Sequence, residues 1–262
     1  EGYKGIAKLT EGTDITLNAM IVPTAVNIYS KKLPFGAVKG DQKAFLTQLQ
    51  SDLAASGINW IDLSEPFAAC DKATQLYYRT DHHWTSDAAL LAYQTYNKTL
   101  GLDDSTTYSQ KILSDSFKGT LSASSGLRTS ETDEIYAYLP DQVTDYTVSL
   151  TAENTKSASV FDVQSLSTKS QYNVFFGGNH PEVVIDSASE SKKVLMVFKD
   201  SYANCFVPFL IPDYARIIMI DPRYYTEDIS ETIQSNGVTD ILFLYNANTA
   251  AEDHSLYQLT AQ

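Results

Sequence analysis

Apolar positions along this chain recur with two different periods, and the two periods alternate. Short apolar runs, the pattern of strands buried in a parallel sheet, lie at 15–22, 58–63, 193–198, 216–220 and 240–245. Segments with the apolar spacing of helices lie between them, at 42–53, 86–100 and 227–236. This alternation predicts an α/β domain, with a parallel sheet covered by helices on both faces.

The middle of the chain, from about residue 103 to residue 191, has a different pattern. It is rich in Ser, Thr and Tyr, and its short alternating pieces at 134–139 and 146–150 are typical of antiparallel hairpins. We interpret 103–191 as a β-rich insertion within a single domain that spans residues 1–262. We expect this insertion to form one wall of a cleft.

Composition narrows the class of protein. The net charge is −13 and no basic patch is visible, so nucleic acid and anionic membrane surfaces are poor candidates as partners. The chain has no run of about 18 apolar residues, so the sequence predicts no membrane span. We also expect no signal segment in this chain. The abundance of Ser, Thr, Asn and Tyr favours an extracellular or cell-envelope protein. Cys70 and Cys205 could pair, but a buried free thiol is the favoured interpretation of Cys205.

The run 80–85, Thr-Asp-His-His-Trp-Thr, brings acid–base groups together just before a predicted helix. Histidine is the side-chain type that usually carries protons in catalysis, so His83 is a candidate base, and Asp81 could fix the tautomer of its imidazole. Taken alone, this pair is more typical of a buried histidine with a structural role. His82 is expected to point the other way in an extended loop. Thr85 or the residue after it should cap the helix.

Ser201 follows the strand at 193–198, where a helix is expected to begin. A serine at such a turn lies at the carboxyl edge of a parallel sheet, near a helix N-terminus that can stabilise an oxyanion. The arrangement has the logic of a nucleophile elbow, although no Gly-x-Ser-x-Gly is present. An apolar helix is expected over 203–210, kinked or ended by Pro208. Asp200 is interpreted as a helix cap.

With these residues in place, the chain resembles the DHHW family, which is similar to the SGNH hydrolase-like O-acetyltransferases of alginate modification. The resemblance is carried by 22–24 (Val-Pro-Thr), 76–84 (Leu-Tyr-Tyr-Arg-Thr-Asp-His-His-Trp), 198–202 (Phe-Lys-Asp-Ser-Tyr), 221–224 (Asp-Pro-Arg-Tyr) and 240–246 (Asp-Ile-Leu-Phe-Leu-Tyr-Asn). It implies a flavodoxin-like SGNH fold that is circularly permuted, because common SGNH hydrolases place the serine block first. By this resemblance Ser201 is the nucleophile, His83 the general base and Asp81 the orienting acid.

The sequence departs from the common SGNH pattern in three places. The serine block reads Lys-Asp-Ser instead of Gly-Asp-Ser, and Asp81 lies two positions before His83 instead of three. The nearest equivalent of the Gly-x-Asn-Asp block is Asn246 or Asn248. Candidates for oxyanion or substrate binding are Tyr202, Asn246, Asn248, Arg79 and Tyr245. Core packing is the alternative role for the tyrosines, and pairing with a nearby acid is the alternative for the arginine.

Three functions remain open at this point. The leading one is a serine esterase or O-acetyltransferase that acts on acetyl groups of a cell-surface or extracellular polysaccharide, through an acyl-enzyme on Ser201 and without a metal or organic cofactor. Its partners would be the carbohydrate and, for transfer, an acyl-donor membrane protein. The second is a non-catalytic glycan-binding or assembly module on a degenerate hydrolase fold. The third, a metal-dependent phosphoesterase using 81–83, is disfavoured because only His180 and His254 remain as further histidine ligands.

Overall fold

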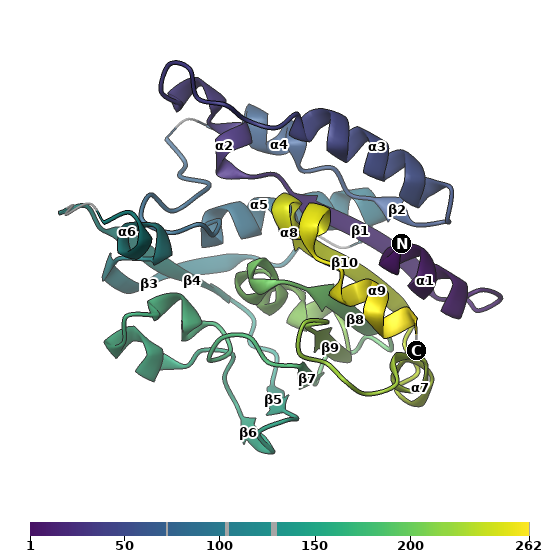
Figure 1. The fold of residues 1–262 in the computed structure, drawn as a ribbon. Helices are drawn as coiled ribbons and strands as arrows, with labels where there is room; N and C mark the ends of the chain where they lie inside the picture. Colours follow the sequence, from purple (N-terminus) through teal and green to yellow (C-terminus); the bar gives the residue numbers. More distant parts are fainter. Residues whose placement is uncertain (72, 103–104, 127–129, 262) are drawn as a thin grey trace.

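The computed structural model describes residues 1–71, 73–102, 105–126 and 130–261. An eight-stranded sheet with the order β2-β1-β10-β8-β9-β7-β5-β6 forms its centre (Figure 1). The first five strands of this order run parallel to one another. They are β1 (Thr16–Val22), β2 (Asn59–Trp60), β8 (Val194–Lys199), β9 (Arg216–Ile220) and β10 (Asp240–Asn246). The predicted α/β fold with a parallel core is therefore confirmed.

The sheet is mixed, because three further strands extend it in the antiparallel sense. Strand β7 (Glu182–Ser187) pairs with β9, β5 (Tyr146–Leu150) pairs with β7, and β6 (Thr155–Ser157) pairs with β5. Strands β3 (Tyr108–Phe117) and β4 (Asp133–Pro140) form a separate antiparallel hairpin. All five strands lie within the segment that we interpreted as an insertion, whose expected start at residue 103 lies outside the described residues.

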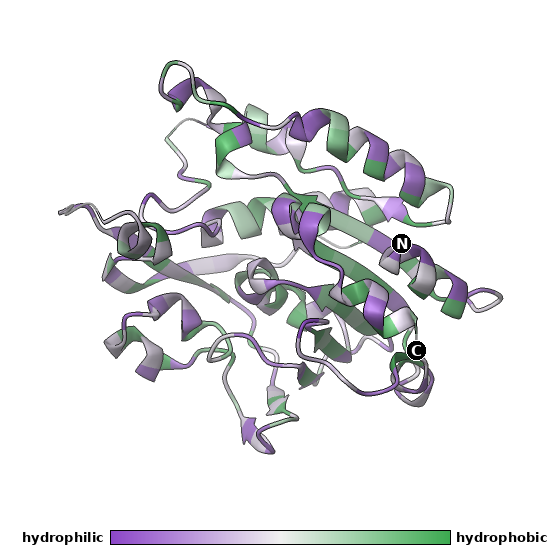
Figure 2. Ribbon diagram, in the orientation of Figure 1, coloured by the Kyte–Doolittle hydropathy of each residue, from purple (hydrophilic) through white to green (hydrophobic). Residues whose placement is uncertain are grey.

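Helices cover both faces of the sheet, as predicted. Side chains alternate along each strand, so Met20 and Val22 pack into one core while Ala19 and Ile21 pack into the other. The first core is covered by α4 (Ser64–Ala69) and α5 (Ser86–Leu100). The second is covered by α1 (Gly2–Leu9), α3 (Gln42–Ala54), α7 (Ile229–Ser235) and α9 (Ser255–Thr260). Figure 2 shows the central strands of the sheet as strongly hydrophobic, whereas the hairpin of residues 108–117 and 133–140 is paler.

Short helices make most of the remaining connections. They are α2 (Ala25–Ile28), η1 (Ser30–Lys32), α6 (Thr120–Ser124), η2 (Val163–Ser167), η3 (Gln171–Val174), η4 (Ser201–Cys205), η5 (Val207–Asp213) and α8 (Ala247–Glu252). The single apolar helix expected over 203–210 is wrong, since η4 and η5 replace it. Pro208 lies in the first turn of η5 and Pro212 lies inside it, and neither can donate the N–H that an α-helix needs.

One other expectation also changed. The strand expected over 58–63 is reduced to Asn59–Trp60, because only these two residues pair with β1 at the edge of the sheet.

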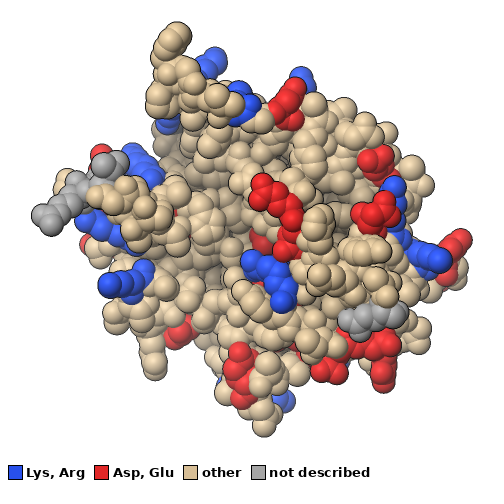
Figure 3. Space-filling model, in the orientation of Figure 1, with Lys and Arg blue, Asp and Glu red and all other residues tan. Residues whose placement is uncertain are grey.

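Cys70 and Cys205 are both free, and burial raises the pKa of the Cys205 thiol to about 12. Within the described ranges, no helix is long and apolar enough to cross a membrane. Figure 3 shows acidic groups scattered over the visible face, in keeping with the net charge of −13.

Candidate functional site

The loop that contains Asp81 and His83 is closed at its base by the backbone. Tyr77 and Trp84 form an isolated antiparallel bridge, and the N–H of Tyr78 donates to the carbonyl oxygen of His83 at 3.2 Å. The chain then enters α5 directly, so the loop is held between a bridge and a helix. This anchoring fixes where the two side chains can point.

The N-cap of α5 is Thr85, one of the two residues that the sequence indicated as its cap. Its hydroxyl oxygen accepts the N–H of Ala88 at 3.2 Å and its hydroxyl donates to the carbonyl oxygen of Gln75 at 2.6 Å. One side chain therefore caps the helix and ties it to the strand-like segment that precedes the loop.

A buried carboxylate lies inside the same loop. Asp133, the first residue of β4, accepts the N–H groups of Arg79 and Thr80 and the hydroxyl of Thr80, at 2.7 to 3.0 Å. It also accepts the side-chain amide of Gln75 at 2.7 Å. These donors would otherwise be unpaired in a tight turn, so the hairpin residue Asp133 shapes the loop from within.

Ser201 is the first residue of η4 and follows the carboxyl end of β8. Asp200 caps this helix, since its Oδ1 accepts the N–H of Tyr202 at 2.9 Å. The first N–H groups of a helix have no acceptor inside the helix. Among the described residues, the N–H of Ser201 makes no hydrogen bond, so it is available to a developing negative charge.

Two hydrogen bonds join η4 to the loop. The indole Nε1 of Trp84 donates to the carbonyl oxygen of Tyr202 at 2.8 Å, and the hydroxyl of Tyr202 donates to the carbonyl oxygen of His82. Trp84 is fully buried, so its indole also packs in the core beneath the loop. The serine and histidine segments, 118 residues apart in sequence, are thereby fixed against each other.

The structure brings Ser201, His83 and Asp81 into one hydrogen-bonded chain. Ser201 Oγ lies 2.7 Å from His83 Nε2, and His83 Nδ1 lies 2.5 Å from Asp81 Oδ1. An ionised carboxylate only accepts hydrogen bonds, so Nδ1 of the imidazole carries the hydrogen. In the neutral imidazole Nε2 then has a free lone pair, and it accepts the hydroxyl of Ser201. This is the arrangement in which a histidine can take a proton from a serine.

The carboxylate of Asp81 is kept ionised by its donors. Burial by itself raises its pKa, but hydrogen bonds from the ring and backbone of His83 and from the backbone of Thr120 outweigh burial and hold the pKa well below its usual range. The N–H and hydroxyl of Thr120 lie 2.8 and 3.1 Å from Asp81 Oδ2. A Cβ at Gly119 would lie 2.2 Å from that oxygen, so this close approach requires a glycine.

His82 does not point away from His83, which corrects the expectation from the sequence. The ring centroids of the two histidines are 3.9 Å apart, because the chain bends here instead of running extended. Nδ1 of His82 lies 2.7 Å from the hydroxyl of Thr120, and burial together with the neighbouring His83 lowers the pKa of His82. Ligand atoms of Asp81, His82 and His83 lie within 4.8 Å of one another. A metal there would have to displace a hydrogen bond of His83, whose two ring nitrogens are both engaged.

Tyr172, in η3, stacks on the imidazole of His83. The ring centroids are 3.7 Å apart with 9° between the planes, and the tyrosine hydroxyl donates to the carbonyl oxygen of Ser201 at 3.3 Å. This residue was not predicted from the sequence, and neither were Gly119, Thr120 and Asp133. Each reaches the loop from a segment distant in sequence, and no local motif marks any of them.

The remaining predicted site residues lie in different settings. Tyr245 is buried in the core on the opposite face of the sheet from Trp84, and Arg79 is exposed and pairs with Glu131 at 3.6 Å. The amide of Asn246 donates to Asp200 Oδ2 at 2.6 Å and to the hydroxyl of Thr249 at 2.7 Å, while its oxygen caps α8. The exposed side chain of Asn248 makes no hydrogen bond to the described residues, so of the two asparagines it is the one with a free amide.

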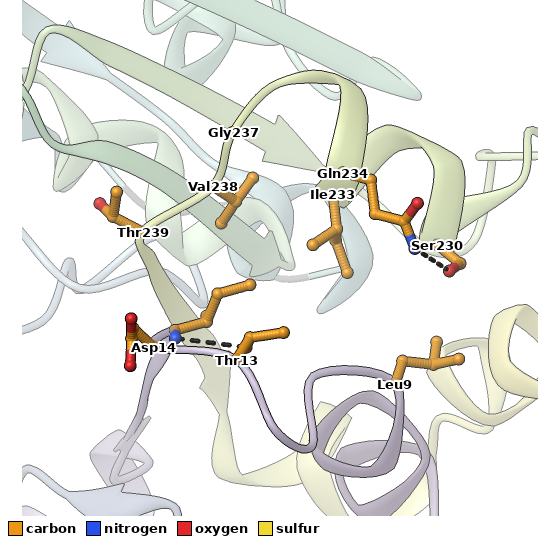
Figure 4. Close-up of a pocket in the computed structure, with 10 residues that line it drawn as sticks. Leu9, Thr13, Asp14, Ser230, Ile233, Gln234, Gly237, Val238 and Thr239 are labelled. Atoms are coloured by element: carbon orange, nitrogen blue, oxygen red, sulfur yellow. Dashed lines mark hydrogen bonds between the residues drawn. The ribbon is translucent and has the colours of Figure 1, made fainter.

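One pocket of the fold lies away from this site. It lies between the turn after α1 and helix α7 with the turn that follows it, where Asp14 and Thr239 precede β1 and β10 (Figure 4). Parallel strands begin at that edge of the sheet, whereas Ser201 follows the edge where they end. The pocket in Figure 4 is therefore remote from the Ser201–His83–Asp81 chain.

The sequence of this chain matches a known protein family. Residues 4–169 match the sequence model of the family described as "SGNH hydrolase-like domain, acetyltransferase AlgX". None of the curated proteins matches the chain.

Three solved structures have a similar fold. A DHHW family protein from Eubacterium siraeum has a TM-score of 0.81 at 24% identity, over 98% of this chain and 87% of that one. PatB1 from Bacillus cereus, solved with a sulfonyl adduct, has a TM-score of 0.78 at 21% identity, over 97% and 89% of the two chains. The O-acetyltransferase domain of Pseudomonas putida AlgJ has a TM-score of 0.59 at 12% identity, over 99% and 87%. At these identities the likeness is one of fold.

Proposed function

From the premise that the chain belongs to the SGNH hydrolase-like acetyltransferase family described by AlgX, we propose that it transfers or removes acetyl groups of a polysaccharide. The observation that carries the proposal is the continuous hydrogen-bonded chain from Ser201 through His83 to Asp81. In this proposal Ser201 is the nucleophile, His83 the general base and Asp81 the group that orients the imidazole.

The reaction follows from the tautomer of His83. As Ser201 Oγ bonds to the acetyl carbonyl carbon, its proton passes to Nε2, and Asp81 stabilises the imidazolium that forms. The bond to the donor oxygen then breaks, and that oxygen takes the proton from Nε2. The acetyl group remains as an ester on Ser201 until a sugar hydroxyl or water attacks its carbonyl carbon, with His83 accepting the proton of the attacking group. The bond from this carbon to Ser201 Oγ then breaks, and Oγ takes the proton back from Nε2. Transferase and esterase activity differ only in this last acceptor.

The negative charge that develops on the acetyl carbonyl oxygen needs hydrogen-bond donors that are already in place. The free N–H of Ser201 at the start of η4 is the first, and we propose the amide of Asn248 as the second. Asn246 is better suited to hold Asp200, which caps the same helix, because both of its amide hydrogens are engaged.

The setting of this activity is also part of the proposal. We place the protein outside the cell or in the cell envelope, with a carbohydrate as its substrate. For a transferase, an acyl-donor membrane protein would supply the acetyl group. The O-acetyltransferase domain of AlgJ and the acetyltransferase family description support the acetyl chemistry, and they leave the glycan open.

The nucleophile can be tested by covalent labelling. PatB1 carries a sulfonyl adduct, so an arylsulfonyl fluoride and p-nitrophenyl acetate are suitable probes. We expect one label per chain on Ser201 by peptide mass spectrometry, and none in Ser201→Ala. His83→Ala should slow labelling by about 10³- to 10⁴-fold. Asp81→Asn should slow labelling somewhat less, because His83 remains as the base while its tautomer is no longer fixed.

Ser122→Ala is a matched control, since Ser122 is a serine of the nearby helix α6 outside the hydrogen-bonded chain. It should label at the wild-type rate. Labelling that survives in Ser201→Ala, or the absence of labelling with every acyl donor tried, would favour the non-catalytic glycan-binding module instead.

A further inference from the structure

The loop of residues 33–40 holds two apolar side chains fully in solvent. The exposed fraction of Phe35 is 109% and that of Val38 is 98%. Gly36, between them, has a φ of +79°, a conformation that side-chain-bearing residues rarely adopt, so it makes the turn at the tip of the loop. Exposed apolar side chains gathered on one projecting loop are a feature of interaction surfaces.

Positive charge surrounds these two side chains. Segment 26–43 contains four lysines and a single acid in a chain whose net charge is −13. The acid, Asp41, accepts the N–H of Ala44 as the N-cap of α3. All four lysines are exposed, and they are Lys31, Lys32, Lys39 and Lys43. In Figure 3 an uncharged projection at the top of the molecule has basic groups near its base.

The loop leaves the edge of the sheet at which Ser201 lies. It follows β1 through α2 and η1, and Ser201 follows the parallel strand β8, so both come after carboxyl ends of strands. The hydroxyl oxygen of Tyr29, just before η1, accepts the N–H of Leu76 at 3.0 Å and so connects the base of the loop to the start of the histidine segment. A surface docked at the tip would therefore face the same end of the sheet.

We propose that loop 33–40 docks the protein onto an anionic lipid surface. Phe35 and Val38 enter the boundary between headgroups and acyl chains, and the lysines bind lipid phosphates. A lipid surface fits better than a protein, because a convex tip with two apolar side chains offers far less than the roughly 800 Å² per partner of a stable protein interface. This inference does not depend on the proposed acetyl chemistry.

The net negative charge of the whole chain does not oppose this docking. Charges in solution are screened over about 8 to 10 Å at physiological salt, so a lipid surface at the tip responds mainly to the nearby lysines. The expectation that anionic membranes are poor partners rested on the net charge and on the view that the sequence has no basic patch. The four exposed lysines of segment 26–43 correct that view at one projecting loop.

Co-sedimentation of the full chain with vesicles tests the proposal. We expect binding to vesicles of phosphatidylglycerol and phosphatidylcholine, weaker binding to phosphatidylcholine alone, and loss of this preference from about 50 mM to about 500 mM NaCl. The double variant Phe35→Ser/Val38→Ser should bind at least about fivefold less. Phe35→Trp should add a blue-shifted emission when anionic vesicles are present.

Val143→Ser is the matched control, because Val143 is 84% exposed on another loop, between β4 and β5. It should bind as the wild type does. The proposal is overturned if the wild type does not bind anionic vesicles at low salt, or if the loop variant and the control bind equally. Self-association that disappears in the loop variant, without vesicle binding, would assign the loop to a protein contact and also overturn it.

Discussion

The imidazole of His83 is restrained from four directions. Asp81 holds Nδ1, Ser201 binds Nε2, Tyr172 covers one ring face, and the ring of His82 lies alongside. The histidine is almost completely buried, so few alternative rotamers are open to it. In the proposed mechanism, restraint of this kind would lower the cost of reaching a reactive geometry, since His83 would not have to be oriented again in each turnover.

The stacked tyrosine gives a prediction at the residue scale. Tyr172→Leu removes the ring contact, which for aromatic pairs contributes about 0.5 to 1.5 kcal/mol, so kcat should fall about two- to thirteenfold with KM nearly unchanged. Tyr172→Phe keeps the ring and should retain wild-type kcat within about twofold. Hydrolysis of p-nitrophenyl acetate measures both parameters.

A structural role alone would predict a different pattern. Tyr93→Leu is the comparison, because Tyr93 stacks on Phe209 with ring centroids 5.6 Å apart in the same core. It should lower the melting temperature and leave kcat unaltered for the folded fraction. If Tyr172→Leu behaves in the same way, Tyr172 packs the core without positioning His83.

At the scale of elements, local sequence patterns correctly predicted the helices and strands whose formation depends mainly on local interactions. Helix α5 begins and ends where the sequence indicated, because Thr85 caps it and Gly101 ends it with a φ of +64°. The buried strands were also predicted, since continuous apolar runs need no knowledge of their neighbours. The same reasoning placed Ser201 at the end of β8 and the histidine segment before α5.

Other features depend on contacts that no local pattern records. Tyr172 reaches His83 from η3, and the glycine required at residue 119 is explained only by the approach of Asp81. The division into η4 and η5 depends on two prolines whose effect is clear only once the helix type is known. The antiparallel strands from the middle segment join the main sheet through pairing with β9, which is again a long-range choice.

The cap of α5 gives a prediction at this scale. Thr85→Ala should lower the free energy of unfolding by about 1 to 2 kcal/mol, because it removes the cap and also the buried hydroxyl's bond to Gln75. Asp41→Ala, which removes the exposed cap of α3, should cost about 0.5 to 1 kcal/mol. Urea unfolding measures both changes. Activity should fall only in Thr85→Ala, since α5 follows directly from the loop that holds His83. Equal losses of activity in the two variants would contradict this coupling.

At the scale of the molecule, a buried lysine joins three separate parts of the fold beneath Ser201. The ammonium of Lys199, at the end of β8, donates to Asn179 Oδ1 at 2.8 Å and to Asn204 Oδ1 at 3.0 Å. It also lies 3.6 Å from the carboxylate of Asp221, which the guanidinium of Arg223 binds with two hydrogen bonds. Where the common SGNH serine block has a glycine, this chain thus has a charged connection between the middle segment, η4 and the turn after β9.

This connection predicts how stability depends on pH. Burial, opposed by the attraction of Asp221 and Asp200, lowers the pKa of Lys199 from 10.5 to about 8. Between these two values the unfolded chain binds a proton that the folded chain has released, so raising the pH favours folding. The free energy of unfolding of the wild type, measured in urea relative to Lys199→Met, should therefore rise from pH 8 toward pH 10.5. Tyrosines that titrate in this range are common to both proteins and cancel in the difference. A difference that stays flat or falls would mean that the hydrogen bonds and the carboxylates stabilise the buried ammonium as well as water does.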